Sequence, residues 1–172
     1  PQANNSSAPS KAVETRFFSV ADLAFAISFV GYDDGFRMLK SFRPFERKTA
    51  DKESLLFTLT IDDSTRPVAK ERRERIREFA TGNGTTIVDR LQDGGYQYII
   101  KDINAAECAL LIADKDFSHC ACALRGNVLM RSFGLNNAIM LVYAFAGASK
   151  GTVLMHASVA RQGGYGYAFI AK

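Results

Sequence analysis

Cysteine and histidine are scarce in this sequence, which has three of the first and two of the second among 172 residues. A small secreted scaffold would need more cysteines, in an even number, to build a disulfide framework. We therefore expect three reduced thiols and a cytoplasmic protein. A zinc site needs four ligands, and the sequence contains no C-x-x-C pair to begin one.

Long apolar runs are also missing. No stretch reaches the roughly 18 consecutive apolar residues that a membrane-spanning helix needs. The longest run, 138–146, lies too deep in the chain to be a signal peptide. The first residues are rich in Asn, Ser, Ala and Pro, and we expect residues 1–14 to form a disordered tail. No membrane partner is predicted.

A strong excess of one charge is absent as well. The net charge is +4, which is too small to indicate a nucleic-acid partner. In the most charged segment, 67–78, opposite charges recur at three- and four-residue spacing, which predicts a solvated helix. Its arginines could contact phosphate, but the interleaved glutamates cancel most of their field, and no aromatic residues alternate with them. These arginines are Arg72, Arg73, Arg75 and Arg77.

Apolar residues, by contrast, make up 47% of the chain, which is enough for a core in a chain of this length. Alternating apolar residues predict strands, and turn residues such as Asp93-Gly94-Gly95 predict that neighbouring strands form hairpins. The expected strands cover 16–20, 23–29, 55–61, 85–91, 96–101, 108–113, 118–124, 152–160 and 165–171.

Two helices complete the expected fold. Asp33-Asp34 should begin a short helix that ends before Pro44. Residues 132–146 are apolar around almost the whole helix circumference, which predicts a buried central helix. The resulting class is α+β: a mostly antiparallel sheet of hairpins with one buried central helix and one or two short helices. Residues 15–130 should form an N-terminal α+β domain, followed by the helix and strands of 131–172.

Two groups of residues invite a chemical interpretation. His119, Cys120 and Cys122 could ligate a metal, but on a strand the two cysteines share one face and His119 lies on the other. Buried free thiols are therefore the favoured interpretation. His156 could be a general base, but the sequence marks no triad partner. We favour a hydrogen-bonded core histidine.

The remaining motifs favour structural roles. The aromatic connection 41–45 should pack over a sheet face, the alternative being an exposed docking patch. The pairs Asp33-Asp34 and Asp62-Asp63 suit turns and caps better than acid–base chemistry. The glycine clusters at 82–84, 94–95 and 163–164 do not match the phosphate-loop pattern, and each lies at an expected hairpin turn or helix end.

The C-terminal segment resembles a known family. Its first strand reads Gly151-Thr152-Val153-Leu154-Met155-His156-Ala157-Ser158-Val159-Ala160, and Tyr165-Gly166-Tyr167-Ala168-Phe169-Ile170 follows the Arg161–Gly164 turn. This pattern is similar to the strand-turn-strand that leads into the phosphate loop of HPr kinase/phosphorylase-like proteins. The upstream residues 135–138 and 143–146 look like the helix that precedes it in that family. Residues 42–45 and 56–59 look like the N-terminal region of Bacteroidetes-type members.

The resemblance implies a nucleotide-dependent serine kinase, of which this chain is a non-catalytic N-terminal portion. The family's phosphate loop would begin at or just after Lys172, so Lys172 is not its phosphate-binding lysine. No catalytic, cofactor-binding or metal-binding residue can be assigned, and ATP and Mg²⁺ are expected only for a longer protein. The expected partners are the remainder of the kinase domain and a second copy joined through the terminal strand.

Two other functions remain open from the residues alone. The chain could be a self-contained regulatory module that binds a small ligand or a protein. A deep apolar pocket lined by aromatic residues, with convergent polar groups, would favour that alternative. A self-contained enzyme that uses His156 is the weaker third possibility.

Overall fold

The computed structural model describes residues 11–49, 54–155 and 157–169. In chain order, the elements are β1 (Val13–Val20), β2 (Leu23–Val30), the 3-10 helix η1 (Gly35–Phe45), β3 (Glu46–Arg47), β4 (Thr58–Ile61), the 3-10 turn η3 (Lys70–Arg72), β5 (Arg73–Ala80), β6 (Gly84–Leu91), β7 (Tyr96–Asp102), β8 (Glu107–Ala113), β9 (His119–Leu124), α1 (Val128–Ala148), β10 (Ser158–Gln162) and β11 (Tyr165–Phe169). Most of the expected tail lies outside the described residues, but β1 already begins at Val13, inside the predicted 1–14 boundary.

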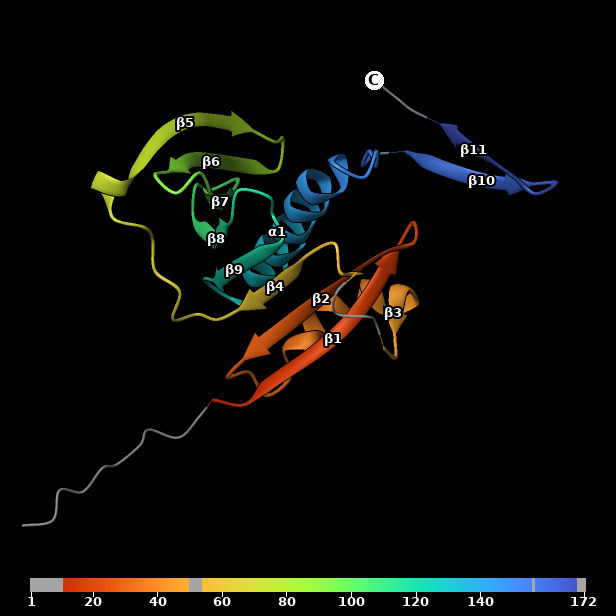
Figure 1. Cartoon of the computed structure of the whole chain (residues 1–172), viewed down its shortest axis with the longest axis horizontal. Coiled ribbons are helices and arrows are strands. Elements are labelled where there is room, and N and C mark those ends of the chain that lie inside the picture. Colours follow the sequence, from red (N-terminus) through yellow and green to blue (C-terminus); the bar gives the residue numbers. More distant parts are fainter. Residues whose placement is uncertain (1–10, 50–53, 156, 170–172) are drawn as a thin grey trace, which may run out of the picture.

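Within the described ranges, nine strands form one sheet in the order β3-β1-β2-β4-β9-β8-β7-β6-β5, and β10 and β11 form a separate hairpin (Figure 1). All pairs in the large sheet are antiparallel except β2 with β4 and β4 with β9. The predicted α+β class with a mostly antiparallel sheet is therefore confirmed. The hairpins predicted over 85–101 and 108–124 are present as β6–β7 and β8–β9.

The long helix α1 lies against one face of this sheet, over β7, β8 and β9 (Figure 1). It begins at Val128, earlier than predicted, because the Asn127 side chain accepts hydrogen bonds from the backbone N–H groups of Leu129 and Met130. Such a cap satisfies backbone donors that have no partner within the helix. The inward face carries Leu135, Ala138, Ile139, Val142 and Ala146, all buried.

A glycine allows the helix to approach β8 closely. A Cβ atom built on Gly134 would lie only 2.6 Å from the carbonyl oxygen of Cys108. No side chain fits in that space, so any other residue would push the helix away from the sheet. Because the helix and the sheet share one hydrophobic core, such a shift would loosen packing along the whole of α1.

The prediction that α1 is buried all round is wrong. Leu129 is 81% exposed, and Met140 and Phe145 are about half exposed. The sheet covers only one side of the helix, so its apolar residues divide into an inner and an outer face. By length and composition alone α1 could also cross a membrane, but the core helix of a soluble α+β domain meets the same criterion.

The predicted helix over 67–78 is also wrong, because this segment forms η3 and then strand β5. Arg73 and Arg75 both form ion pairs with Asp89 on the adjacent strand β6. Residues 73 and 75 lie two apart, and this spacing suits a strand. The glycines at 82–84 accordingly turn a β5–β6 hairpin instead of ending a helix.

The short helix predicted from Asp33-Asp34 is a 3-10 helix that runs through Pro44. Asp34 stands at its N-cap position but makes no side-chain capping hydrogen bond, so the predicted capping role is not found there. In the aromatic connection that follows, Phe42 packs edge-on against Phe18 at 6.2 Å between ring centroids. Phe45 is 43% exposed, so only part of this connection covers the sheet.

Candidate functional site

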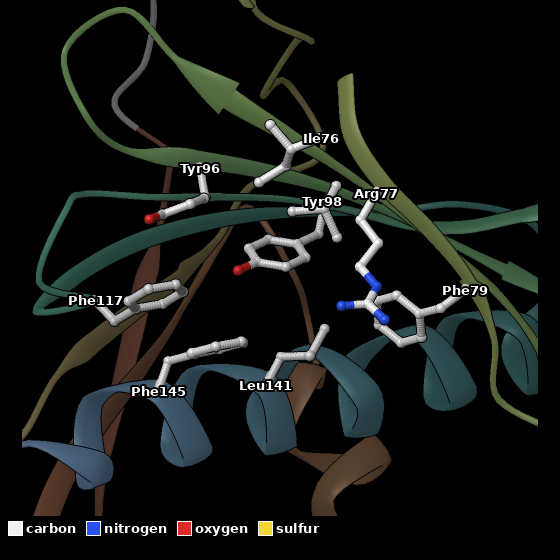
Figure 2. A pocket seen from close by; sticks show the side chains of 9 residues that line it. Ile76, Arg77, Phe79, Tyr96, Tyr98, Phe117, Leu141 and Phe145 are labelled. Atoms are coloured by element: carbon white, nitrogen blue, oxygen red, sulfur yellow. The ribbon is translucent and has the colours of Figure 1, made fainter. Parts of the chain in front are cut away.

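A cavity of about 500 Å³ opens between the β5–β7 end of the sheet and the second half of α1 (Figure 2). Its walls are mostly aliphatic and aromatic, and three of its side chains carry polar groups at their ends. The lining residues are Ile76, Arg77, Phe79, Val88, Tyr96, Tyr98, Phe117, Leu141 and Phe145.

The alternation of the strands explains which residues reach this cavity. Val88 on β6 lies opposite Tyr98 on β7, and residues directly opposite in an antiparallel pair share a face. Tyr96 is two residues from Tyr98 and therefore points to the same side. From below, Leu141 and Phe145 reach up from α1, where a four-residue spacing places them on one face of the helix (Figure 2).

Aromatic rings form a continuous wall on one side of the cavity. Phe117, in the β8–β9 turn, stacks on Tyr96 with 5.5 Å between centroids and on Phe145 with 4.8 Å. The interplanar angles are 19° and 16°, so the three rings are nearly parallel. Tyr98 is tilted against Phe145 at 6.2 Å.

A β-bulge in β5 turns Arg77 toward the cavity. Arg75 lies opposite Asp89, but the register shifts by one residue before Arg77, which lies opposite Val88. An extra residue in one strand sends the following side chains to the other face. Arg73 and Arg75 therefore face Asp89, while Arg77 extends toward α1 into the space that Tyr98 also enters (Figure 2).

The arginines on the two faces of β5 differ in their partners. Arg73 and Arg75 hydrogen-bond to Asp89, which also accepts a bond from Gln97 at 3.2 Å. Burial opposes ionisation of Asp89, but the bonds from Arg75 and Arg73 outweigh it and hold its pKa below the ordinary value. Arg77 forms no ion pair or hydrogen bond with any residue that the structure describes.

The Tyr98 hydroxyl, like Arg77, makes no hydrogen bond with the residues that the structure describes. The side chain is only 2% exposed, and burial raises the pKa of Tyr98 well above that of an ordinary tyrosine, so the phenol stays protonated at neutral pH. The described residues that line the cavity are apolar, aromatic or, in Arg77, cationic, and this arrangement suits binding.

The residues predicted as metal candidates lie elsewhere. Cys120 and Cys122 share the core face of β9, as their spacing predicted, and burial raises the pKa of each thiol to about 12. The His119 side chain is 80% exposed and lies 3.2 Å from Asp114 through Nδ1. In the described ranges no three His, Cys, Asp or Glu residues are placed to hold a metal ion. His156 lies outside the described residues.

A second polar cluster was not anticipated from the sequence. Asp62 forms the expected turn by accepting hydrogen bonds from Ser64, but Asp63 does something different. Its carboxylate accepts hydrogen bonds from Tyr32 at 2.7 Å, from Arg131 at 2.6 Å and from the backbone of Leu124 at 3.0 Å. These partners come from distant segments of the chain, so Asp63 ties the start of α1 to the sheet.

Residues 152–155 and 157–169, which we call the C-terminal arm, extend from the end of α1 (Figure 1). Gly163 and Gly164 have φ values of +58° and +84°, so the predicted turn is present as a two-residue hairpin loop of the type that favours glycine. However, β10 begins at Ser158, and residues 152–155 are not a strand. The prediction of a strand buried on both faces is wrong, because every residue of β10 and β11 is exposed.

Comparison of the chain with protein-family models, with curated proteins and with solved structures finds no match. The likeness to HPr kinase/phosphorylase-like proteins therefore stays a prediction from the residues themselves.

Proposed function

We propose that this chain is the N-terminal, non-catalytic part of a nucleotide-dependent serine kinase of the HPr kinase/phosphorylase-like type, acting in the cytoplasm. The observation that carries the proposal is the C-terminal arm. Its antiparallel hairpin of β10 and β11 coincides with the turn and the second strand of the segment that carries the resemblance, while in the first strand of that segment only 158–160 are extended.

The C-terminal arm exposes many apolar side chains, and such a surface is typical of a segment that packs against a partner. Its exposed apolar side chains are Val153, Leu154, Met155, Val159, Tyr165, Tyr167 and Phe169. An isolated two-stranded hairpin is at best marginally stable in water, and a contiguous apolar surface usually marks an interaction site. In the described chain β10 and β11 pair only with each other.

The remainder of a kinase core would supply the missing cover. Further strands could pair with the free edges of the hairpin, and helices could cover its apolar side chains. ATP and Mg²⁺ would then bind to residues of that longer protein, since phosphate binding needs a glycine-rich loop at a helix N-terminus with a nearby cation. The role of the present chain would be to position or regulate that core.

Calorimetry with Mg-ATP on two proteins tests the proposal. We expect no binding by residues 1–172 and micromolar binding by a version extended through the natural reading frame beyond Lys172. Hydrogen exchange on the same pair should show the amides of 158–169 becoming protected only in the longer protein. Micromolar binding by the short chain would refute the proposal, and so would an extended protein that neither binds nucleotide nor protects the arm.

A further inference from the structure

The proposed kinase function gives no role to the cavity between β5–β7 and α1. We infer that it is a binding site for a small planar aromatic anion. The aromatic body would lie against the stacked rings of Tyr96, Phe117 and Phe145, and the anionic group would meet Arg77. The inference depends only on the geometry of the cavity and is independent of the proposed kinase.

The size and the walls of the cavity suit such a molecule. Small-molecule sites commonly have volumes of about 300–1,000 Å³, and this cavity measures about 500 Å³. Its aromatic wall is a stack in which Phe117 lies between Tyr96 and Phe145, with centroids 5.5 Å and 4.8 Å away (Figure 2). A flat ring can make edge-to-face contacts with this stack while Leu141 and Val88 cover its other edges, whereas a branched or bulky ligand would lose these contacts.

The charge of the ligand follows from Arg77. The bulge in β5 points this residue into the cavity, away from Asp89, which pairs with the neighbouring Arg73 and Arg75. Among the described residues, no acidic side chain lines the cavity to neutralise the guanidinium. A guanidinium presents a planar fork of donors that matches a carboxylate in two parallel hydrogen bonds. An anionic group at this end of the ligand would therefore be recognised.

A second observation points to a ligand independently of the charge. The Tyr98 side chain is 2% exposed, and its hydroxyl is directed into the cavity without a partner among the described residues (Figure 2). No buried side-chain oxygen or nitrogen of the described residues lacks a partner, so this hydroxyl is accessible from the cavity. Polar groups in folded proteins nearly always have a hydrogen-bond partner in the protein or in ordered solvent, and a ligand in the cavity would take the place of that solvent. A void left by imperfect packing would be lined by apolar atoms alone. The Tyr98 hydroxyl instead offers a donor and an acceptor to a polar atom on the ligand.

Two isosteric probes test this inference: 2-naphthoate, which is anionic, and 2-naphthamide, which is neutral. Both are titrated into the 172-residue chain while backbone amide shifts are followed by NMR. For ligands of this size we expect a dissociation constant on the order of 0.1–1 mM for the naphthoate. The amide should bind about threefold to tenfold more weakly, and the shifts should concentrate on β5–β7 and on the second half of α1.

Matched variants locate the two polar contacts. R77Q should weaken naphthoate binding to the level of naphthamide and leave naphthamide binding unchanged. R90Q removes the same charge from an exposed position on the neighbouring strand β6, outside the cavity, and should change neither. Y98F should weaken binding of both probes about threefold or more, with thermal unfolding checked to show that the fold is intact.

Four results would overturn the inference. One is the absence of cavity shifts at about 5 mM probe, well above the expected dissociation constant. Another is equal affinity for the two probes. A third is equal weakening by R77Q and R90Q, which would mean that general electrostatic attraction explains the binding. The last is a set of shifts confined to 158–169, which would place the probes on the apolar C-terminal arm.

Discussion

Helix α1 and the C-terminal arm are both rich in apolar residues, yet they differ in how much of their surface is buried. α1 buries one whole face against the sheet, while every residue of β10 and β11 is exposed. The difference lies in the neighbours, because the nine-stranded sheet presents α1 with an apolar surface and the described chain presents none to the arm. An apolar composition indicates that a segment is stabilised by burial, but whether it is buried depends on which other segments pack against it.

The largest expected loss of stability comes from a substitution on the buried face of α1. Leu135→Ala removes a side chain that is 0% exposed, between α1 and the sheet, and should lower the free energy of unfolding by about 2–5 kcal/mol. Val159→Ala in the arm, where Val159 is 69% exposed, is the matched control and should change it by less than about 0.5 kcal/mol. Urea denaturation measures both. Similar losses at the two positions would mean that the arm is buried in solution.

The buried carboxylate on the opposite face of the sheet should have the next largest effect. Asp89→Ala deprives Arg73, Arg75 and Gln97 of a shared acceptor, and should cost about 2 kcal/mol. Glu78→Ala is the control, because Glu78 contacts Arg75 only at the surface, at 3.8 Å. Such an exposed pair contributes less than about 1 kcal/mol. If both variants lose the same amount, the buried cluster does not stabilise β5 specifically.

The same cluster predicts how stability depends on pH. The pKa of Asp89 is lower in the folded protein than the ordinary value, so the folded state binds fewer protons than the unfolded state in the acidic range. An unfolded aspartate titrates at about pH 4. The contribution of Asp89 to the free energy of unfolding is therefore complete well above that pH and is lost as the pH falls below it. Urea titrations between about pH 3 and 7 should show a shallower decline for Asp89→Asn than for the wild type. Parallel curves would contradict this assignment.

A smaller effect is expected within α1 on its outer side. Phe145 is 48% exposed, although it stacks on Phe117 at the mouth of the cavity. Phe145→Ala should therefore cost about 1–2 kcal/mol, below the range for fully buried phenylalanines. A loss above about 3 kcal/mol would restore the prediction, made from the sequence, of a helix buried on all sides.

The smallest effect should come from removing the arm. A chain that ends at Gly151 should have an unfolding free energy within about 0.5 kcal/mol of the whole chain, because in the part that the structure describes β10 and β11 pair only with each other. The amides of 158–162 should exchange rapidly in the intact chain, while those of β8 exchange slowly. Slow exchange in the arm at low concentration would mean that the large sheet covers it. Protection that rises with protein concentration would indicate association of two copies through the arm.

Much of the sheet was predictable because local chemistry encodes it. The hairpins at 85–101 and 108–124 are pairs of short segments rich in apolar residues on either side of a polar turn, Asp93-Gly94-Gly95 in the first, and these signals do not depend on distant parts of the chain. Strand β5 was not predictable in this way. Its charges fit a helix and a strand equally well. The extended form is stabilised by Asp89, which lies 14 residues beyond Arg75 in the chain and binds its side chain.

The cavity was missed for a related reason. Its residues come from β5, β6, β7, the β8–β9 turn and α1, and no short motif connects them. The orientation of Arg77 depends on a one-residue register shift against β6, which no pattern within β5 reveals. The one sequence signal that could have been followed is the density of aromatic residues at Tyr96, Tyr98 and Phe117.

The sequence by itself determined the class of fold, the positions of most strands, the long apolar helix and the glycine turn of the arm. Each of these follows from backbone preferences and from the period of apolar residues over a few neighbouring positions. The tertiary structure decided which apolar faces are covered, which arginines are paired, and where a cavity remains. Those outcomes depend on contacts between residues far apart in the chain, and such contacts exist only once the sheet and the helix have come together.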